Sequence, residues 1–306
     1  MIQSFATMGE RILAMGRQSV VVAAAQDDDV LLSIDKAAAL GIAEPMLIGR
    51  KDDILKAADH CGVDVTPYEI IEEADDVAAC NLAIRLIREG RADAIMKGLV
   101  STAYVLKAVL NKETGIRDRA LLSHIGLFFI KKTQRFCMVT DAAMCIAPDA
   151  EQKRHILENA VEAAQLLGIE RPNVACVCAL EKVNPAMPAT VDAQTLVRWN
   201  REGIIRDCVV GGPFALDNAL FKEAARLKGV EDPVAGEPDI LLMPNIEAGN
   251  VLYKALAFVA DSPGAGLVLG AKAPVILTSR SDNDETKLNA IILALYLAAM
   301  KKERDR

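Results

Sequence analysis

The sequence has 306 residues, of which 52 % are hydrophobic and only 4 % aromatic, and its formal charge is −7. This length is near the limit at which one hydrophobic core stops growing, so two domains are expected. An acidic chain without basic clusters is a poor candidate for binding nucleic acid. No apolar run is long enough for a membrane span.

The amino terminus and the cysteines indicate the compartment. The first residues lack the basic and apolar regions of a signal peptide. The seven cysteines are odd in number and lie mostly in apolar runs, which favours reduced thiols over a disulfide framework. We therefore expect a cytoplasmic protein.

Apolar strands and amphipathic helices alternate over the first 111 residues. The predicted strands are 19–25, 46–48 and 93–96, and the predicted helices are 3–17, 27–40, 52–61, 74–89 and 102–111. This alternation is typical of a parallel, doubly wound sheet.

A hairpin, with strands at 125–130 and 135–140, interrupts the alternation, and a helix begins at Asp149 with Gln152 as its capping partner. The alternation then resumes with strands at 173–180, 208–211, 239–243, 267–269 and 274–278, and helices at 192–202, 216–228, 248–260 and from about 284 to 300. We expect one α/β domain made of residues 1–140 plus 285–306, and a second made of residues 141–284.

The junction after the strand 274–278 carries the strongest candidate chemistry. Ser279 and Arg280 follow that strand, and ligands of open α/β sheets bind at this edge. Arg280 can bind phosphate or carboxylate oxygens, Ser279 can donate one hydrogen bond, and Asp282, Asp284 and Glu285 are candidate bases. The alternative is a helix start, signalled by Ser281-x-x-Asp284, with a solvated acidic first turn.

Three other junctions between a strand and a helix carry polar residues. They are Lys97-Gly-Leu-Val-Ser-Thr102, Gly211-Gly-Pro-Phe-Ala-Leu-Asp217 and Pro244-Asn-Ile-Glu-Ala-Gly-Asn250. A lysine, two hydroxyls and free helix N–H groups in the first would suit an anion. The competing readings are a helix cap by Ser101 or Thr102, a tight turn, and a helix-dipole glutamate with a capping amide.

Other patterns are weak. Gly264-Ala-Gly-Leu-Val-Leu-Gly270 misses the dinucleotide spacing and precedes a strand. His124 is isolated, so a structural histidine with satisfied hydrogen bonds is expected. No Ser-His-Asp arrangement is readable.

Several segments together resemble the phosphate acetyl/butyryltransferase family. They are the Lys97 and Pro244 segments above, Ala108-Val-Leu-Asn-Lys-Glu-Thr-Gly-Ile-Arg117, Val183-Asn-Pro-Ala-Met-Pro-Ala-Thr190, Gly212-Pro-Phe-Ala-Leu-Asp217, Val234-Ala-Gly236 and Thr278-Ser-Arg280. The resemblance covers nearly the whole chain in the family's order. It implies two doubly wound α/β domains with a cleft between them, arranged as in isocitrate/isopropylmalate dehydrogenases.

The resemblance also implies the reaction acyl-CoA + phosphate = acyl phosphate + CoA, by direct attack in a ternary complex. No metal and no nicotinamide cofactor is expected. A homodimer or higher homo-oligomer and an acyl-phosphate kinase acting beside the enzyme are the expected partners. Departures from the acetyltransferases around Thr102 favour a butyryl or branched acyl group. A phosphate acetyltransferase and a two-lobed anion-binding protein without catalysis are the alternatives.

By resemblance, Ser279 stabilises the tetrahedral oxyanion and Arg280 lies near CoA. The family's base is an aspartate further along, where this chain has Thr286. Asp282, Asp284 or Glu285 would replace it. The expected substrate-binding residues are Lys97, Ser101, Thr102, Arg117, Asp141, Asn184, Gly212, Asp217, Glu247 and Asn250.

Overall fold

The computed structural model describes residues 4–278 and 282–305, and the chain forms two compact α/β units. The central unit is Arg119–Gly264, and the terminal unit is built from the chain on either side, up to Asp118 and from Ala265. The sequence analysis places the boundaries at 140 and 284 instead. Contacts therefore assign the hairpin strands to the central unit and residues 265–284 to the terminal unit.

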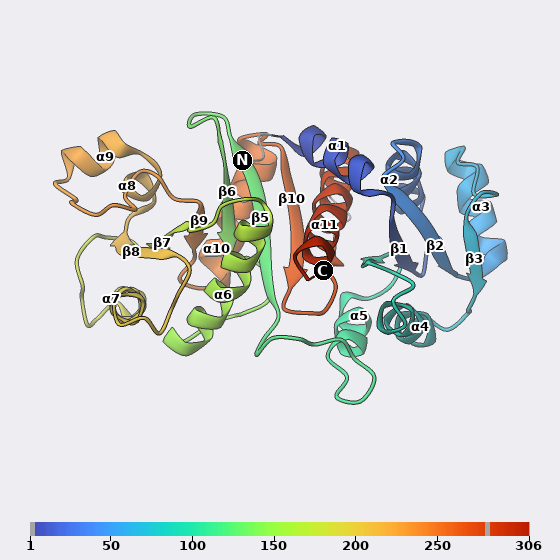
Figure 1. Cartoon of the computed structure of the whole chain (residues 1–306), viewed down its shortest axis with the longest axis horizontal. Helices are drawn as coiled ribbons and strands as arrows, with labels where there is room; N and C mark the ends of the chain where they lie inside the picture. Colours follow the sequence, from blue (N-terminus) through green and yellow to red (C-terminus); the bar gives the residue numbers. More distant parts are fainter. Residues whose placement is uncertain (1–3, 279–281, 306) are drawn as a thin grey trace. The chain divides into compact units, whose positions relative to one another are not determined.

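The terminal unit has a mostly parallel sheet (Figure 1). Its strands lie in the order β3 (Glu69–Glu72), β2 (Ala43–Gly49), β1 (Gln18–Ala23), β4 (Ala94–Lys97), β11 (Val275–Ile276) and β10 (Gly264–Leu269). Neighbouring strands are parallel except β10 and β11, which are antiparallel.

The helices of this unit cover both faces of its sheet. They are α1 (Phe5–Met15), α2 (Asp28–Ala39), α3 (Lys51–Cys61), α4 (Asp76–Arg88), α5 (Thr102–Val109) and α11 (Asp284–Arg304). Figure 1 shows α4 and α5 on one side of the strands and α1, α2 and α11 on the other. The predicted doubly wound α/β class is confirmed here.

Strand β3 is not predicted from the sequence, and the reason is its place in the sheet. The strand reads Glu-Ile-Ile-Glu, and all four side chains are exposed or half-buried. An edge strand pairs with a neighbouring strand on one side only, and its side chains are less buried. It therefore lacks the apolar run that marks a central parallel strand.

The central unit is also built from paired strands and helices. Its strands lie in the order β5 (Ser123–Ile130), β6 (Arg135–Thr140), β9 (Ile240–Leu242), β7 (Asn173–Val177) and β8 (Val209–Phe214). Strands β5 and β6 are antiparallel, which confirms the hairpin, and the others pair in parallel.

Helices again flank these strands. They are α6 (Ala150–Leu166), α7 (Pro188–Arg201), α8 (Leu216–Leu220), α9 (Lys222–Leu227) and α10 (Ile246–Lys254), which continues into the π-helical turn η1 (Ala255–Val259). Asp149 and Gln152 form the predicted capping box of α6. Figure 1 shows α6 and α7 on one side of the strands and α8 and α9 on the other.

The helix predicted over 216–228 is wrong, because the structure has two short helices with Phe221 extended between them. The N–H of Gly236 donates to the carbonyl of Ala219 at 2.9 Å. A continuous helix would need that carbonyl for its own bond four residues on. A contact distant in sequence therefore ends α8.

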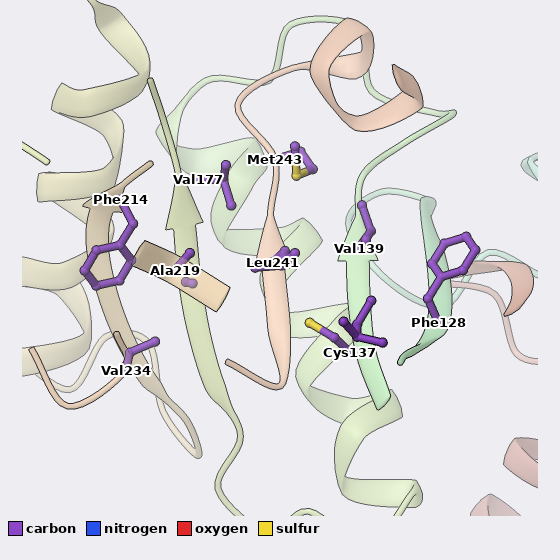
Figure 2. Packing of buried hydrophobic residues seen from close by; sticks show 11 residues of the cluster. Phe128, Cys137, Val139, Val177, Phe214, Ala219, Val234, Leu241 and Met243 are labelled. Carbon is purple, nitrogen blue, oxygen red and sulfur yellow. The ribbon is translucent and has the colours of Figure 1, made fainter. Parts of the chain in front are cut away.

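One apolar layer fixes the lateral order of the central strands (Figure 2). Phe128, Val139, Leu241, Val177 and Phe214 come from β5, β6, β9, β7 and β8 in turn, and Figure 2 shows them across the width of the sheet. Full burial of each such side chain is worth about 1.5–3 kcal/mol. The order of the strands in turn sets the order of the polar loops that follow them.

Candidate functional site

The carboxyl ends of β1, β4 and β11 lie at one edge of the terminal unit. Ala23 of β1 is in register with Lys97 of β4, and Met96 is in register with Ile276 of β11. The loop after Lys97 and the chain that leads to Ser279 therefore start at the same level of the sheet. This is the edge at which parallel α/β sheets bind ligands.

The Lys97 loop passes directly over the end of β1. A Cβ atom at Gly98 would lie 2.0 Å from the carbonyl oxygen of Ala24, so only glycine fits there. The Lys97 ammonium donates to the Gly98 carbonyl at 3.0 Å. Ser101 caps α5, its hydroxyl accepting the N–H of Ala103 at 3.3 Å, and Thr102 is the first residue of the helix. Of the two caps that the sequence leaves open, Ser101 and Thr102, Ser101 is the one observed.

Ser279 and Arg280, the predicted catalytic pair, lie outside the described residues, as does Ser281. The helix after them begins at Asp284, and its cap is Asn283, whose side chain accepts the N–H of Thr286 at 2.8 Å. The predicted Ser281–Asp284 capping signal is therefore wrong. Asparagine is among the preferred residues at a helix cap.

Of the three carboxylate candidates for the base, Glu285 is exposed, and the other two differ in their surroundings. Asp284 is exposed, and the Lys36 ammonium at 2.9 Å lowers the pKa of its carboxyl. A base for a thiol needs a raised pKa, so the surroundings of Asp284 act in the wrong direction. Asp282 is half-buried, and its carbonyl accepts the ammonium of Lys287 at 2.8 Å.

Arg117 is exposed and lies in the segment that follows α5. Its backbone forms an antiparallel bridge with Ala271, in the loop between β10 and β11. The bridge ties the segment after α5 to the connection that precedes β11.

In the central unit, Asp141 follows β6 and is 3 % exposed. Its carboxylate accepts three backbone N–H groups, from His124 at 3.0 Å, Ala143 at 2.7 Å and Met144 at 2.8 Å. These bonds close the turn after β6 and join it to the start of β5. Asp141 thus organises the loop rather than presenting an open carboxylate.

Helix α10 packs against the Asp141 turn. The Asn250 amide donates to the carbonyl of Ala142 at 3.2 Å. A Cβ atom at Gly249 would lie 2.2 Å from the carbonyl oxygen of Asp141, so the helix can approach only with glycine at this position. The capping amide of α10 is Asn245, and Glu247 is an exposed acid in its first turn. Asp141 and Asn250, both predicted from sequence, are therefore neighbours.

His124 differs from the satisfied histidine that the sequence predicts. Its side chain is 8 % exposed, and within the described residues its buried Nδ1 has no hydrogen-bond partner. The ring meets Tyr253 edge to face at 5.3 Å between centroids. Burial lowers the pKa of His124 to about 4, although the negative charge of Asp141 acts to raise it. The imidazole is therefore neutral at physiological pH.

Three more predicted residues lie in the loops after β7 and β8. The Asn184 side chain accepts the N–H of Ala186 at 2.9 Å and so shapes the loop before α7. Gly212 has φ +132°, a region that favours glycine, and lines a hollow of about 550 Å³ with Arg198 and other residues of α7. Asp217 accepts the Lys228 ammonium, which lowers the pKa of its carboxyl.

Lys287 is not predicted from the sequence as a functional residue, and it is 3 % exposed near the start of α11. Its spacing from Ala290, Ile291 and Ala294 places it on the apolar face of the helix, and that spacing is the signal that could have found it. Within the described ranges, no group of three or more His, Cys, Asp or Glu side chains is arranged to hold a metal ion. No helix of those ranges has the length and apolarity of a membrane span.

Comparison with known proteins identifies the relationship. The model of the family described as phosphate acetyl/butaryl transferase matches residues 77–295. This chain belongs to that family. It is 45 % identical over 301 residues to a phosphate butyryltransferase of Clostridium acetobutylicum, covering 98 % of this chain and 100 % of that one. It is 38 % identical to a phosphate acetyltransferase of Thermotoga maritima over 94 % of this chain and 99 % of the relative.

Among solved structures, a branched-chain phosphotransacylase from Enterococcus faecalis matches with a TM-score of 0.82 and 29 % identity. The match covers 92 % of this chain and 99 % of the other. The family assignment made from the sequence motifs is therefore confirmed over nearly the whole chain.

Proposed function

We propose that this enzyme transfers a short-chain acyl group, butyryl or branched, between CoA and inorganic phosphate. The observation that carries the proposal is the 45 % identity, over both full lengths, to a protein named phosphate butyryltransferase. The structural neighbour named a branched-chain phosphotransacylase supports the same acyl class. The acetyltransferase relative, at 38 % identity, makes acetyl transfer the second candidate.

In the proposed reaction, a phosphate oxygen attacks the thioester carbonyl carbon while both substrates are bound. The tetrahedral intermediate then expels the CoA sulfur, and the carbonyl re-forms as acyl phosphate. In reverse, the CoA thiol loses its proton to a base, and the thiolate attacks the acyl phosphate and expels phosphate. The thioester is reactive enough for this exchange, so we propose a route without metal or nicotinamide.

The residues of the terminal unit take the roles that the family resemblance gives them. Ser279 donates to the oxyanion, a contribution of about 3 kcal/mol when preorganised. Arg280 binds an anionic group of CoA. Asp282 is our candidate base, because it is half-buried whereas Asp284 is exposed and its pKa is lowered by Lys36.

The anionic substrate is assigned to the Lys97 loop. Lys97 ends β4 at the carboxyl edge of the sheet, α5 begins at Thr102 soon after it, and the neighbouring Met96 is in register with Ile276 of β11. A lysine beside a helix amino terminus suits phosphate. We also propose that the enzyme is a cytoplasmic homodimer and that an acyl-phosphate kinase acts beside it.

A thiol-release assay tests the function. Purified protein is incubated with butyryl-CoA, with and without phosphate, and free CoA thiol is followed with a disulfide reagent. Phosphate-dependent release supports the transferase, whereas tight ligand binding without release supports a protein that only binds anions. Rates with acetyl-, butyryl- and isobutyryl-CoA then decide the acyl class, and a preference for acetyl-CoA would refute the butyryl assignment.

A further inference from the structure

Lys287 is a buried cation near the start of α11, a helix whose central part is apolar. The side chain is 4 % exposed, and the residues from Ala290 to Ala299 are all buried. An ammonium group withdrawn from water is costly unless it is paired. The first turn of a helix also disfavours a cation, because the helix dipole is positive there. Neither packing nor the helix itself accounts for a lysine at this position.

The Lys287 ammonium has two partners at short range. It donates to Oδ2 of Asp29 at 2.8 Å and to the backbone carbonyl of Asp282 at 2.8 Å. The Asp29 side chain is 53 % exposed, so the ion pair is half-solvated. Such a pair contributes little net stability, and an apolar side chain of similar size would pack as well. What the pair does provide is a fixed distance between two segments.

Those two segments both belong to the candidate site edge. Asp29 lies in the first turn of α2, which follows β1, and β1 is the neighbour of β4. Asp282 lies three positions after Ser279. We propose that Lys287 is a positioning residue, which fixes Asp282, the candidate base, against the start of α2. The inference rests on the proposed function, and it adds a role for a residue that touches neither substrate.

The test compares two lysines of one helix. Lys287→Met removes the ammonium but keeps the length of the side chain. Lys302→Met is the matched control, because Lys302 also lies on α11 and donates to two oxygens, Asp93 Oδ1 at 2.7 Å and Gln18 Oε1 at 3.0 Å, at the far end of the helix. We expect Lys287→Met to lower kcat about 100-fold, as displaced reacting groups do, and Lys302→Met to leave kcat unchanged.

The measurements separate positioning from a purely structural role. KM and kcat are determined at a temperature where circular dichroism shows both variants folded. A loss confined to the melting temperature, with kcat unchanged, would overturn the inference. Asp29→Asn removes the partner charge and keeps the lysine, so it repeats the test if Lys287→Met does not fold. We expect a tenfold fall in kcat, and an unchanged kcat would again overturn the role.

A double-mutant cycle with Asp282→Asn shows whether Lys287 acts through Asp282. If it does, Lys287→Met lowers kcat far less in the Asp282→Asn background than in the wild type. Equal factors in both backgrounds contradict the inference. Failure of the proposed function would look different, because the wild-type enzyme itself would then show no phosphate-dependent thiol release.

Discussion

Asp141 should be a structural carboxylate, and its removal should cost several kilocalories. Asp141→Ala leaves the backbone N–H groups of His124, Ala143 and Met144 without their acceptor in a site that is 3 % exposed. Each buried N–H left unpaired costs about 1–3 kcal/mol. Water can enter the space left by the side chain, so we expect a total of about 4 kcal/mol.

Urea unfolding, followed by circular dichroism, measures this loss. With a slope of about 2.5 kcal/mol per molar urea, the midpoint should fall by about 1.5 M. Asp141→Asn keeps one oxygen and turns an N–H donor toward the N–H of His124, so it should cost about 1–2 kcal/mol. Asp261→Asn is the control, because that side chain is 93 % exposed in the same unit.

Two results would refute this reasoning. An unchanged midpoint for Asp141→Ala would mean that the three bonds do not hold the turn. A stable Asp141→Asn variant that loses its activity would show that the carboxylate binds substrate, as the family resemblance predicts.

The remaining predictions concern four single sites. Gly249→Ala should destabilise by about 2 kcal/mol or more, because its Cβ would lie 2.2 Å from the Asp141 carbonyl oxygen. Gly9 lies in α1, and a Cβ atom there would meet nothing within 4 Å, so Gly9→Ala should stabilise the protein by about 0.5–1 kcal/mol. Equal melting temperatures for Gly249→Ala and Gly9→Ala would contradict both of these predictions. The His124 pKa is lowered from 6.5 to about 4, so the unfolded chain binds its proton first as pH falls. The free energy of unfolding should therefore fall by about 3 kcal/mol between pH 6.5 and pH 4. His124→Phe should remove this part of the decline in urea midpoints. Ser279→Ala should lower turnover about 100-fold with little change in melting temperature, and undiminished turnover would exclude an oxyanion role.

The alternation of apolar strands and amphipathic helices determined the fold class without any structure. Side-chain periodicity reports which face of an element is buried, and that is a local property of the chain. The cap of α5 at Ser101 and the capping box of α6 were also readable, because a cap bonds to a residue only two or three positions away. The family motifs followed in the same way from residues adjacent in sequence.

Tertiary structure decided what depends on residues distant in sequence. The break at Phe221 follows from the bond between Gly236 and Ala219, and the edge strand β3 has no apolar run to announce it. The burial of Lys287 also depends on its distant partner Asp29. Such contacts bring together groups that no local pattern relates. The sequence therefore names the chemistry of this protein, and only the fold shows which carboxylates are already occupied in holding its loops.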